Sequence, residues 1–199
     1  MTEDFFEVVN RQRACRAFSD APVYDPEIAS LLESATHAPS AENRQPWEFV
    51  VVRDAHTRAA IGDLTRRAWE SHGRAFSETR LEPKLLADVD AGATGGVAGA
   101  PVHIVVCADV DRGLEATVPS SIFPAVQNLL LAATALGLGS ALTTITTSYR
   151  AELAALLALP EHVIPVAVIP IGRPAQPLGR PRREPFEGHT HREQYGSAW

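Results

Sequence analysis

The stretch APSAENRQPWEFVVV, residues 38–52, carries the clearest structural signal of the sequence. Its first six residues are rich in Pro, Ser and Asn, the residue types that favour turns. The run Trp47–Val52 that follows is largely apolar, with aromatic and β-branched residues, which is typical of a buried strand. Asp54 comes soon after the run and ends it. We therefore expect a polar turn that leads directly into a strand of the hydrophobic core.

Two helices are predicted before this strand. Apolar residues recur with helical spacing over residues 4–12, and again over residues 26–37 after Asp25, the expected N-cap. Pro26 fits the first turn of the second helix, where its missing N–H costs nothing. An Arg-rich turn, residues 11–16, separates the two helices.

Helices and strands alternate after the same strand. Residues 55–90 are charged and favour helices, whereas the Gly- and Ala-rich residues 91–100 are expected to form a mobile connection. Pro165 and Pro170 fall within the last predicted strand. They indicate either that this strand lies at a sheet edge or that the prolines lie at its ends. The remaining predicted elements are strands at residues 102–108, 140–146 and 163–171, a buried helix at residues 122–137 that is entered at Pro124, and a helix at residues 150–159.

Length and composition indicate one globular domain of the cytoplasm. The chain has 199 residues, of which 45% are hydrophobic, so its core needs no disulfide or metal. A net charge of -6 excludes a protein that coats nucleic acid or an anionic membrane. Cys15 and Cys107 are isolated thiols, and the acidic N-terminus does not resemble a signal peptide. The continuous apolar run of residues 129–139 is too short to span a bilayer, so we expect no membrane partner.

Several common site motifs are missing from the sequence. Residues 92–99 lack the GxGxxG spacing, no GK(S/T) follows a glycine pair, and there is no GxSxG elbow. His189, His191 and Glu193 lie in a Pro-rich tail without a compact third and fourth ligand, so no metal site is predicted. Cys15 is expected to be a small packed residue, although neighbouring arginines would lower its pKa if it were exposed.

Positive charge is concentrated near the two ends of this acidic chain. Lys84 is the only lysine, and the 17 arginines include one cluster at residues 11–16 and another at residues 180–183. Each cluster alone is typical of a solvated face or of surface ion pairs. Arg also binds phosphate oxygens in a bidentate manner, so the two clusters and a polar loop could together form a phosphate pocket. The residues alone leave both interpretations open.

The order and spacing of these segments resemble the FMN-dependent nitroreductase family. That family typically carries R-R-S-x-R-x-F followed by A-P-S-x-x-N-x-Q-P-W-x-F-x-V, and residues 12–18 and 38–51 of this chain are similar to these two motifs. The resemblance covers nearly the whole chain and is weakest between residues 54 and 100. Its C-terminal part consists of residues 127–140, which resemble the central dimer helix and its following turn, and of Leu159-Pro160 and residues 166–172 and 181–185.

This resemblance implies the overall architecture. It implies a single α+β domain over residues 1–199 with a central, mostly antiparallel sheet flanked by helices. Residues 55–100 would be a variable helical or loop insertion over the pocket, and residues 172–199 an extended C-terminal arm. The resemblance further implies an intertwined homodimer with FMN at the subunit interface.

The resemblance also implies the activity and the binding residues. It implies an FMN oxidoreductase that passes hydride from NADPH or NADH to an electron-poor acceptor, such as a nitroaromatic, quinone or enone, by a ping-pong mechanism. No side chain is implied as catalytic, because flavin N5 carries the hydride, and Arg16 is expected near flavin N1 and O2. The implied FMN-binding residues are Gln12, Arg13, Ala14 and Arg16 in the first turn, Pro39, Ser40 and Asn43 from the partner subunit, Thr143, Thr144 and Ile145 on the N5 side, and Arg182 and Arg183 at the phosphate.

Two departures from the family pattern keep alternatives open. Gln12 and Ala14 stand where the family usually has Arg and Ser, so a charge and a hydroxyl are lost. Losing one charge-assisted hydrogen bond costs on the order of 1.5–3 kcal/mol unless Arg11 or Arg180 replaces it. One alternative is a flavin-fragmenting enzyme similar to dimethylbenzimidazole synthases, which Ala14 disfavours because those enzymes have an acidic residue there. The other is a non-catalytic FMN-binding or storage protein.

Overall fold

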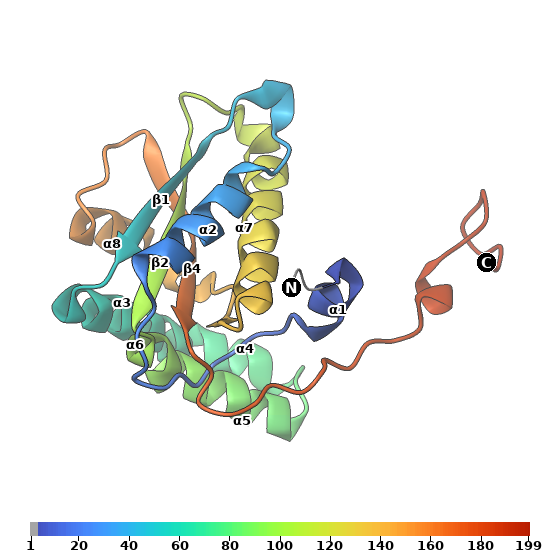
Figure 1. Ribbon diagram of the computed structural model, residues 1–199, viewed down its shortest axis with the longest axis horizontal. Coiled ribbons are helices and arrows are strands. Elements are labelled where there is room, and N and C mark those ends of the chain that lie inside the picture. The colour runs from blue at the N-terminus through green and yellow to red at the C-terminus, as the bar shows by residue number, and fades with distance from the viewer. Residues whose placement is uncertain (1–3) are drawn as a thin grey trace.

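The computed structural model describes residues 4–199 and has one four-stranded sheet between layers of helices (Figure 1). All neighbouring strands are antiparallel. The strands are β1 (Trp47–Val52), β2 (Val102–Asp109), β4 (Val163–Gly172) and β3 (Gly139–Ser140), in this order across the sheet. The α+β class with an antiparallel sheet is therefore confirmed.

Strand β2 lies at the centre of the core, and every one of its residues is buried. β1 is an edge strand and is only partly buried; Val51 is 37% exposed. The pairing of β2 with β4 shifts between Val106 and Cys107, so that Pro165 lies at a bulge. A bulge tolerates a proline because local ladder bonds are already interrupted there.

One face of the sheet packs against α2 (Asp25–Thr36) and α7 (Val118–Ala135) (Figure 1). Leu31 of α2 and Leu129 of α7 are fully buried against this face. α7 begins at residue 118 and contains Pro124, so the prediction of a start at that proline is wrong. Pro119, in the first turn, takes the position that tolerates a missing N–H.

Helix α7 is the one helix in residues 4–199 that is long and apolar enough to cross a membrane. Its mean hydropathy is 1.2, and 44% of its residues are buried inside the structure. Leu129 and Ala133 are among those with no exposed surface. The place of α7 in the core of the domain therefore accounts for its length and its apolar composition.

The other face of the sheet is covered by α3 (Ala55–Ala68) and α8 (Arg150–Leu156), with Ile61 and Leu153 fully buried. The chain continues from α3 through a π-helix, η2 (Trp69–Gly73), into α4 (Arg74–Glu78) and α5 (Pro83–Ala91). A second π-helix, η3 (Gly92–Gly96), then leads into α6 (Val97–Gly99). We call residues 55–100 the insertion; the structure shows that it is predominantly helical.

The expected mobile connection at residues 91–100 is wrong. This segment is helical, and Ala93, Val97 and Ala100 are buried in the structure. Its small residues allow close packing of helices, since a Cβ placed on Gly62 of α3 would lie 2.9 Å from the Cα of Ala98. Glycine here serves close approach and not flexibility.

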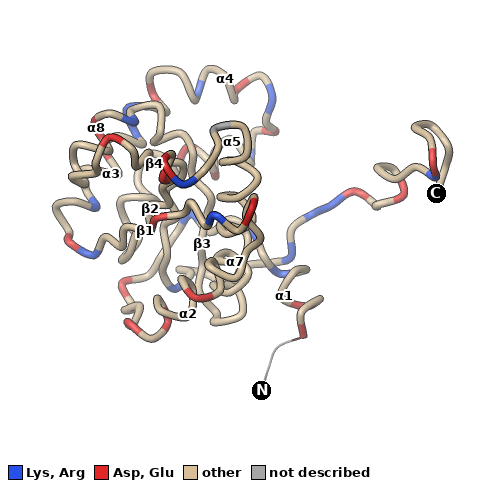
Figure 2. The backbone as a smooth tube through the Cα atoms, turned by 90° about the horizontal axis from the view of Figure 1, so that it is seen from above, with Lys and Arg blue, Asp and Glu red and all other residues tan. Residues whose placement is uncertain are grey.

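The two ends of the chain meet near β3 before they separate. α1 (Phe5–Arg11) is capped by Asp4, and the following turn forms a parallel bridge between Ala14 and Ser140. Past β4, Pro174 bridges back to Phe18. Beyond Gly179 the chain leaves the body as an exposed extension that ends near a short 3-10 helix, η6 (Phe186–His189) (Figures 1 and 2).

Candidate cofactor-binding site

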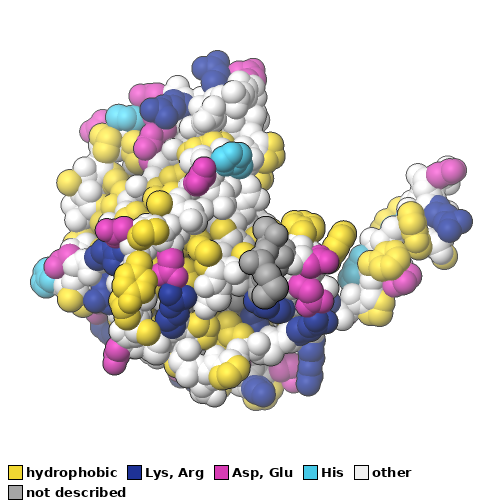
Figure 3. All heavy atoms as spheres, viewed as in Figure 1, with side chains coloured by type: hydrophobic (Ala, Val, Ile, Leu, Met, Phe, Trp, Pro, Cys, Tyr) yellow, Lys and Arg dark blue, Asp and Glu magenta, His cyan; other side chains and the backbone are white. Residues whose placement is uncertain are grey.

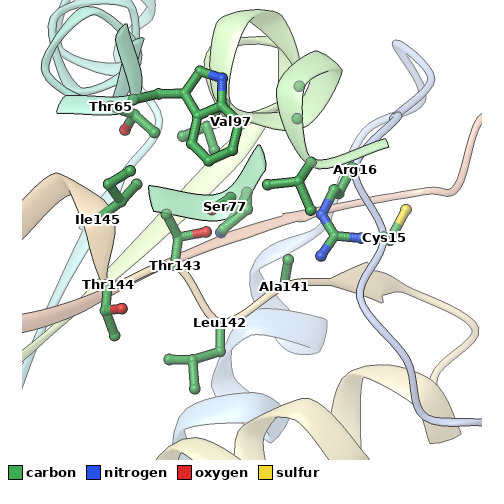
Figure 4. Close-up of a pocket in the computed structure, with 16 residues that line it drawn as sticks. Cys15, Arg16, Thr65, Ser77, Val97, Ala141, Leu142, Thr143, Thr144 and Ile145 are labelled. Atoms are coloured by element: carbon green, nitrogen blue, oxygen red, sulfur yellow. The ribbon is translucent and has the colours of Figure 1, made fainter. Parts of the chain in front are cut away.

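A cavity of about 270 Å³ lies between the Arg-rich turn, the insertion and the segment that follows β3 (Figure 4). Three parts of the chain that are far apart in sequence thus form one site. The lining residues are Cys15 and Arg16 of the turn, Thr65, Trp69, Ser77, Val89, Gly92, Ala93, Gly96 and Val97 of the insertion, and residues 141–145 and Pro170 beside the sheet.

The Arg-rich turn reaches the cavity because it pairs with β3 like a short additional strand. The backbone N–H of Cys15 donates to the Ser140 carbonyl at 2.8 Å, next to the Ala14 bridge. The Arg16 guanidinium points toward the cavity (Figure 4) and has no hydrogen bond or ion pair within residues 4–199. Burial lowers the pKa of Arg16, and the attraction of Asp88 opposes this effect. An Arg side chain remains protonated in proteins, so the cavity contains a half-buried cation.

Cys15 is packed as expected and is not poised for chemistry. It is 1% exposed, and its Sγ contacts the Ala17 carbonyl at 3.2 Å, pointing away from the cavity in Figure 4. Burial raises the pKa of this thiol, against the smaller opposing effects of the Ala17 contact and of the nearby Arg13 and Arg16 charges. The thiolate that nucleophilic chemistry requires is therefore disfavoured.

Residues 141–145 form another wall of the cavity. Thr143 exchanges two backbone hydrogen bonds with Val168, at 3.0 and 2.9 Å, and the chain then enters a 3-10 helix, η5 (Ile145–Tyr149). The Thr65 and Thr146 hydroxyls, both buried, lie 2.7 Å apart and tie this wall to α3. The predicted residues Thr143, Thr144 and Ile145 thus line the cavity.

The predicted strand at residues 140–146 is wrong beyond Ser140. Ser140 pairs with Ile171, so the next pair would place Ala141 opposite Pro170. Val168 and Pro170 direct their backbone groups to the same side of β4, because strands have a period of two. Val168 bonds Thr143 on that side, and Pro170 has no N–H to donate there. The ladder therefore breaks at Pro170 and leaves room for the cavity.

The walls of the cavity suit a flat aromatic ligand with an electron-rich edge. Trp69 and Val97 present apolar surface, Thr65 and Ser77 present hydroxyls, and Arg16 supplies a positive charge. Binding sites for small molecules combine apolar walls with a few polar groups in this way. An FMN ring therefore fits the chemistry of the residues present.

A second cavity, of about 290 Å³, adjoins the first and shares Cys15 and Arg16 with it. Arg13 and Ala14 line it together with Asp88 and residues 176–179. The Arg13 guanidinium donates to the Gly179 carbonyl at 3.1 Å. Four neighbouring residues of the turn thus lie at two joined cavities. Gln12, the other predicted residue of this turn, is half-buried and forms the C-cap of α1.

The remaining predicted residues lie apart from these cavities in their own chain. Ser40 Oγ accepts the backbone N–H of Gln45 at 3.0 Å, and Asn43 Oδ1 accepts its side-chain amide at 3.2 Å, in the polar loop after α2 that begins near Pro39. Arg182 and Arg183 lie on the exposed extension, where Arg183 donates to the Arg182 carbonyl at 2.8 Å. Neither group lines the two cavities, so their predicted contact with FMN stays a prediction.

The arginines that could have replaced the lost charge are engaged elsewhere. Arg11 donates to the Thr134 carbonyl at 3.3 Å, near the C-terminal end of α7. A cation stabilises such a helix end. Arg180 forms an ion pair with Glu7 at 2.7 Å. These contacts favour structural roles for both side chains.

The described residues contain one cluster with possible metal ligands, Asp109, Asp111 and His162, whose ligand atoms lie within 4.8 Å of one another. The Asp109 carboxylate already accepts the Asp111 N–H at 2.9 Å and pairs with Arg112 at 3.1 Å. In the tail, His189 pairs with Glu184 at 3.0 Å. Asp109 and His189 thus each have a partner within the protein.

Sequence reasoning missed the contribution of the insertion. Trp69, Gly92 and Gly96 line the cavity, although the resemblance is weakest in this region. The available signals were an isolated Trp in a charged helix and a cluster of glycines. The glycine cluster by itself predicts flexibility, because the residues against which it packs are far away in the sequence.

The fold and the site together define an α+β protein with a cation-bearing ligand cavity at one edge of an antiparallel sheet. Residues 9–173 match the model of the Nitroreductase family. The chain therefore belongs to the nitroreductase family, and the resemblance seen in its motifs is confirmed.

Individual relatives agree with this assignment. A protein of Methanothermobacter thermautotrophicus assigned as an NADH dehydrogenase/NAD(P)H nitroreductase is 32% identical over 182 residues, 88% of this chain and 80% of the relative. A 5,6-dimethylbenzimidazole synthase of Rhodospirillum rubrum is 34% identical over 143 residues, 64% of this chain and 63% of that protein. A solved structure described as a nitroreductase of Desulfovibrio desulfuricans in complex with FMN has a TM-score of 0.74 and 28% identity, and covers 98% of this chain and 99% of that one. The predicted enzyme class, an NAD(P)H-dependent FMN oxidoreductase, agrees with these names.

Proposed function

We propose that the protein is a cytoplasmic, homodimeric oxidoreductase that takes hydride from NAD(P)H and passes it, through FMN, to an electron-poor small molecule such as a nitroaromatic, quinone or enone. The observation that carries this proposal is the unpaired Arg16 cation in a cavity walled by Trp69 and residues 143–145. FMN, when bound, supplies an N5 position that accepts and then donates hydride. One cavity that serves reductant and acceptor in turn would give ping-pong kinetics.

The protein's own residues would bind, orient and shield the ring. Arg16 would stabilise negative charge at the N1 and O2 edge, because a preorganised cation in a partly desolvated site is more effective than solvent. Trp69 and Val97 would exclude water from the ring. Thr143 and Thr144 would face the N5 side from a backbone that Val168 holds in place.

A second copy of the chain would complete the site. An apolar groove of about 580 Å³ between α1, α2 and α7 is lined by Phe5, Val8 and Leu131, and Phe5 is 64% exposed. Large exposed apolar surfaces mark interfaces. A partner seated on this face would cover it, and we expect the loop with Pro39, Ser40 and Asn43 to reach FMN from that partner. Arg182 and Arg183 would then close on the phosphate.

Reduction and reoxidation of the purified protein test this function. After reconstitution with FMN, the protein should retain a flavin absorbance band, and mixing with NADH or NADPH without oxygen should bleach it rapidly. A nitroaromatic or quinone should then restore the band. Failure to bind flavin would refute the proposal, and bound flavin that neither nucleotide reduces would indicate a storage protein.

A flavin-fragmenting enzyme is the second candidate, because the Rhodospirillum rubrum relative is named as a 5,6-dimethylbenzimidazole synthase. Ala14 disfavours this candidate. It lines the second cavity at the position where those enzymes have an acidic residue, and it carries no such group. Product analysis under oxygen distinguishes the two. Loss of the flavin chromophore together with a benzimidazole product would favour the fragmenting enzyme.

A further inference from the structure

The insertion contains two π-helices, and both line the first cavity. Trp69 begins η2, and Gly92 and Gly96 are the first and last residues of η3. Single π-turns within helices are rare and frequently occur at functional sites. The side of η3 that faces the Arg-rich turn carries these two glycines, which makes the contact between insertion and turn unusually close.

Gly92 and Gly96 leave no room for a side chain against Arg16. A Cβ placed on Gly92 would lie 2.6 Å from Arg16 Cδ and 3.1 Å from its Cβ and Cγ. A Cβ placed on Gly96 would overlap the Arg16 carbonyl oxygen. The first glycine therefore touches the aliphatic stem of Arg16, and the second touches its backbone.

The neighbouring glycines show that this is a property of position and not of composition. Gly95, in the same π-helix, and Gly99, in α6, have no atom within 4 Å of an added Cβ. Of these four positions, only the two that face Arg16 require glycine, because a side chain there would clash with packed atoms. A flexible linker would show no such difference.

The π-helix is anchored on both sides of its contact with Arg16. The Trp69 indole N–H donates to the Asp90 carboxylate at 2.8 Å, two residues before η3. The ring nitrogen Nε2 of His103 lies 2.6 Å from the Val97 carbonyl, directly after η3. Trp69 is 3% exposed and His103 is fully buried, so both anchors are parts of the core.

The guanidinium of Arg16 depends on this contact for its direction. It has no hydrogen bond or ion pair in the described part of the chain, although Asp88, beside the second cavity, attracts its charge. Its aliphatic stem packs directly against Gly92, and this contact limits the directions that the guanidinium can take at the cavity. An unconstrained Arg side chain loses rotamer entropy when it binds a ligand, and a pre-packed one loses less.

We propose that Gly92 and Gly96 are positioning residues, which hold the Arg16 guanidinium over the cavity so that it meets the electron-rich edge of a bound FMN ring. This inference rests on the proposed function, since it assigns the cofactor to that cavity. A side chain at Gly92 would turn the guanidinium away. A side chain at Gly96 would push the Arg16 backbone out of its place beside β3.

The test compares Gly92→Ala and Gly96→Ala with Gly95→Ala as the matched control. Flavin fluorescence would measure FMN binding to the apo-protein, and the midpoint potential of bound FMN would report the charge near N1. We expect about tenfold or greater weakening of FMN binding and a lower potential for the first two variants, because a charge-assisted contact is lost. Gly95→Ala should stay within about twofold of the wild-type affinity, since alanine also favours a helix.

A double variant distinguishes positioning from general damage. If Gly92 acts through Arg16, then Gly92→Ala should change FMN binding and potential little in an Arg16→Ala background, so the two effects are not additive. The double variant removes most of the overlap and should fold even if Gly92→Ala does not. Additive losses, or an unchanged potential in all glycine variants that bind FMN, would overturn the inference. Wild-type protein that binds no FMN would instead refute the proposed function.

Discussion

The two arginine clusters look alike in the sequence and differ completely in the structure. Arg13 and Arg16 belong to a turn that pairs with β3 through Cys15 and lines two cavities. Arg182 and Arg183 lie on an extension that leaves the body of the domain (Figure 2). Hydrophobic side chains near its end are also left uncovered by the body in Figure 3, and Tyr195 is 94% exposed. Similar composition thus has opposite consequences in a packed turn and in a solvated arm.

The physical difference lies in hydration. A half-buried cation without a partner has already lost part of its water, so an anionic ligand gains most by pairing with it. An exposed cation is screened by salt and gains little unless a partner buries it. The predictions below compare the packed body with the arm, from the largest expected effect to the smallest.

Replacing Arg16 should have the largest effect. We expect Arg16→Ala to weaken FMN binding about tenfold to one-hundredfold, because a charge-assisted contact in a partly desolvated site is lost. Titration of the apo-protein with FMN measures the change. Arg66→Ala is the control, since Arg66 does not line the cavity, and among the described residues its guanidinium pairs with Asp63 of its own helix and Glu70 of the π-helix after it. Equal losses in the two variants would show that the cavity is not the cofactor site.

Replacing Arg182 and Arg183 together should have a smaller effect that depends on salt. We expect the double alanine variant to weaken FMN binding by up to about fivefold at low ionic strength, and less at high ionic strength, because exposed charges are screened. The same titration at two salt concentrations measures it. A loss as large as that of Arg16→Ala, and independent of salt, would mean that a partner subunit buries these side chains in the dimer.

Two tryptophans make the same comparison for stability. Trp69→Phe removes the indole hydrogen bond to Asp90 and should lower the free energy of unfolding by about 0.5–1.5 kcal/mol. Trp199→Phe, on the arm where Trp199 is 58% exposed, should change it within about 0.5 kcal/mol. Urea unfolding followed by circular dichroism measures both. A larger loss for the arm variant would contradict the view that the body alone determines stability.

At neutral pH the titration of the buried His103 should have the smallest effect, because its contribution develops only as the pH is lowered. Burial lowers the pKa of His103 from 6.5 to about 4, opposed by its hydrogen bond to Val97. The unfolded chain therefore binds more protons than the folded one between these values, and the free energy of unfolding should fall as the pH is lowered from about 6.5 to about 4. His103→Gln should flatten this slope, with His191→Gln on the arm as the matched control. An unchanged slope in His103→Gln would assign it to other groups.

Local patterns predicted most elements correctly. β1 and β2 are found within one residue of their predicted ranges, and α1 and α2 begin and end close to theirs. α7 starts earlier than predicted because the helix contains Pro124, with Pro119 in its first turn, and the strand after Ser140 is broken opposite Pro170. Pro170 ends the ladder because its backbone faces the position where Ala141 would pair and has no N–H to donate. The hydrophobic periodicity of the sequence does not show which way that backbone faces.

The residues of the candidate site also fall into two groups, those that the sequence predicted and those that only the structure revealed. The motif resemblance selected Arg16 and residues 143–145, and the structure brings these together at one cavity. It did not select Trp69 or Gly92, which line the same cavity from the insertion. Their contribution consists of contacts across the fold, such as Trp69 with Asp90 and Gly92 with Arg16.

The sequence by itself determined the family, the strands β1, β2 and β4 and the turn that carries Arg16, because these depend on residue order and short-range periodicity. Only the tertiary structure decided which glycines of the insertion pack against Arg16 and which of the two arginine clusters is desolvated. The physical reason is that burial and close approach are properties of pairs of distant residues. A glycine or an arginine has the same local pattern whether or not another part of the chain packs against it.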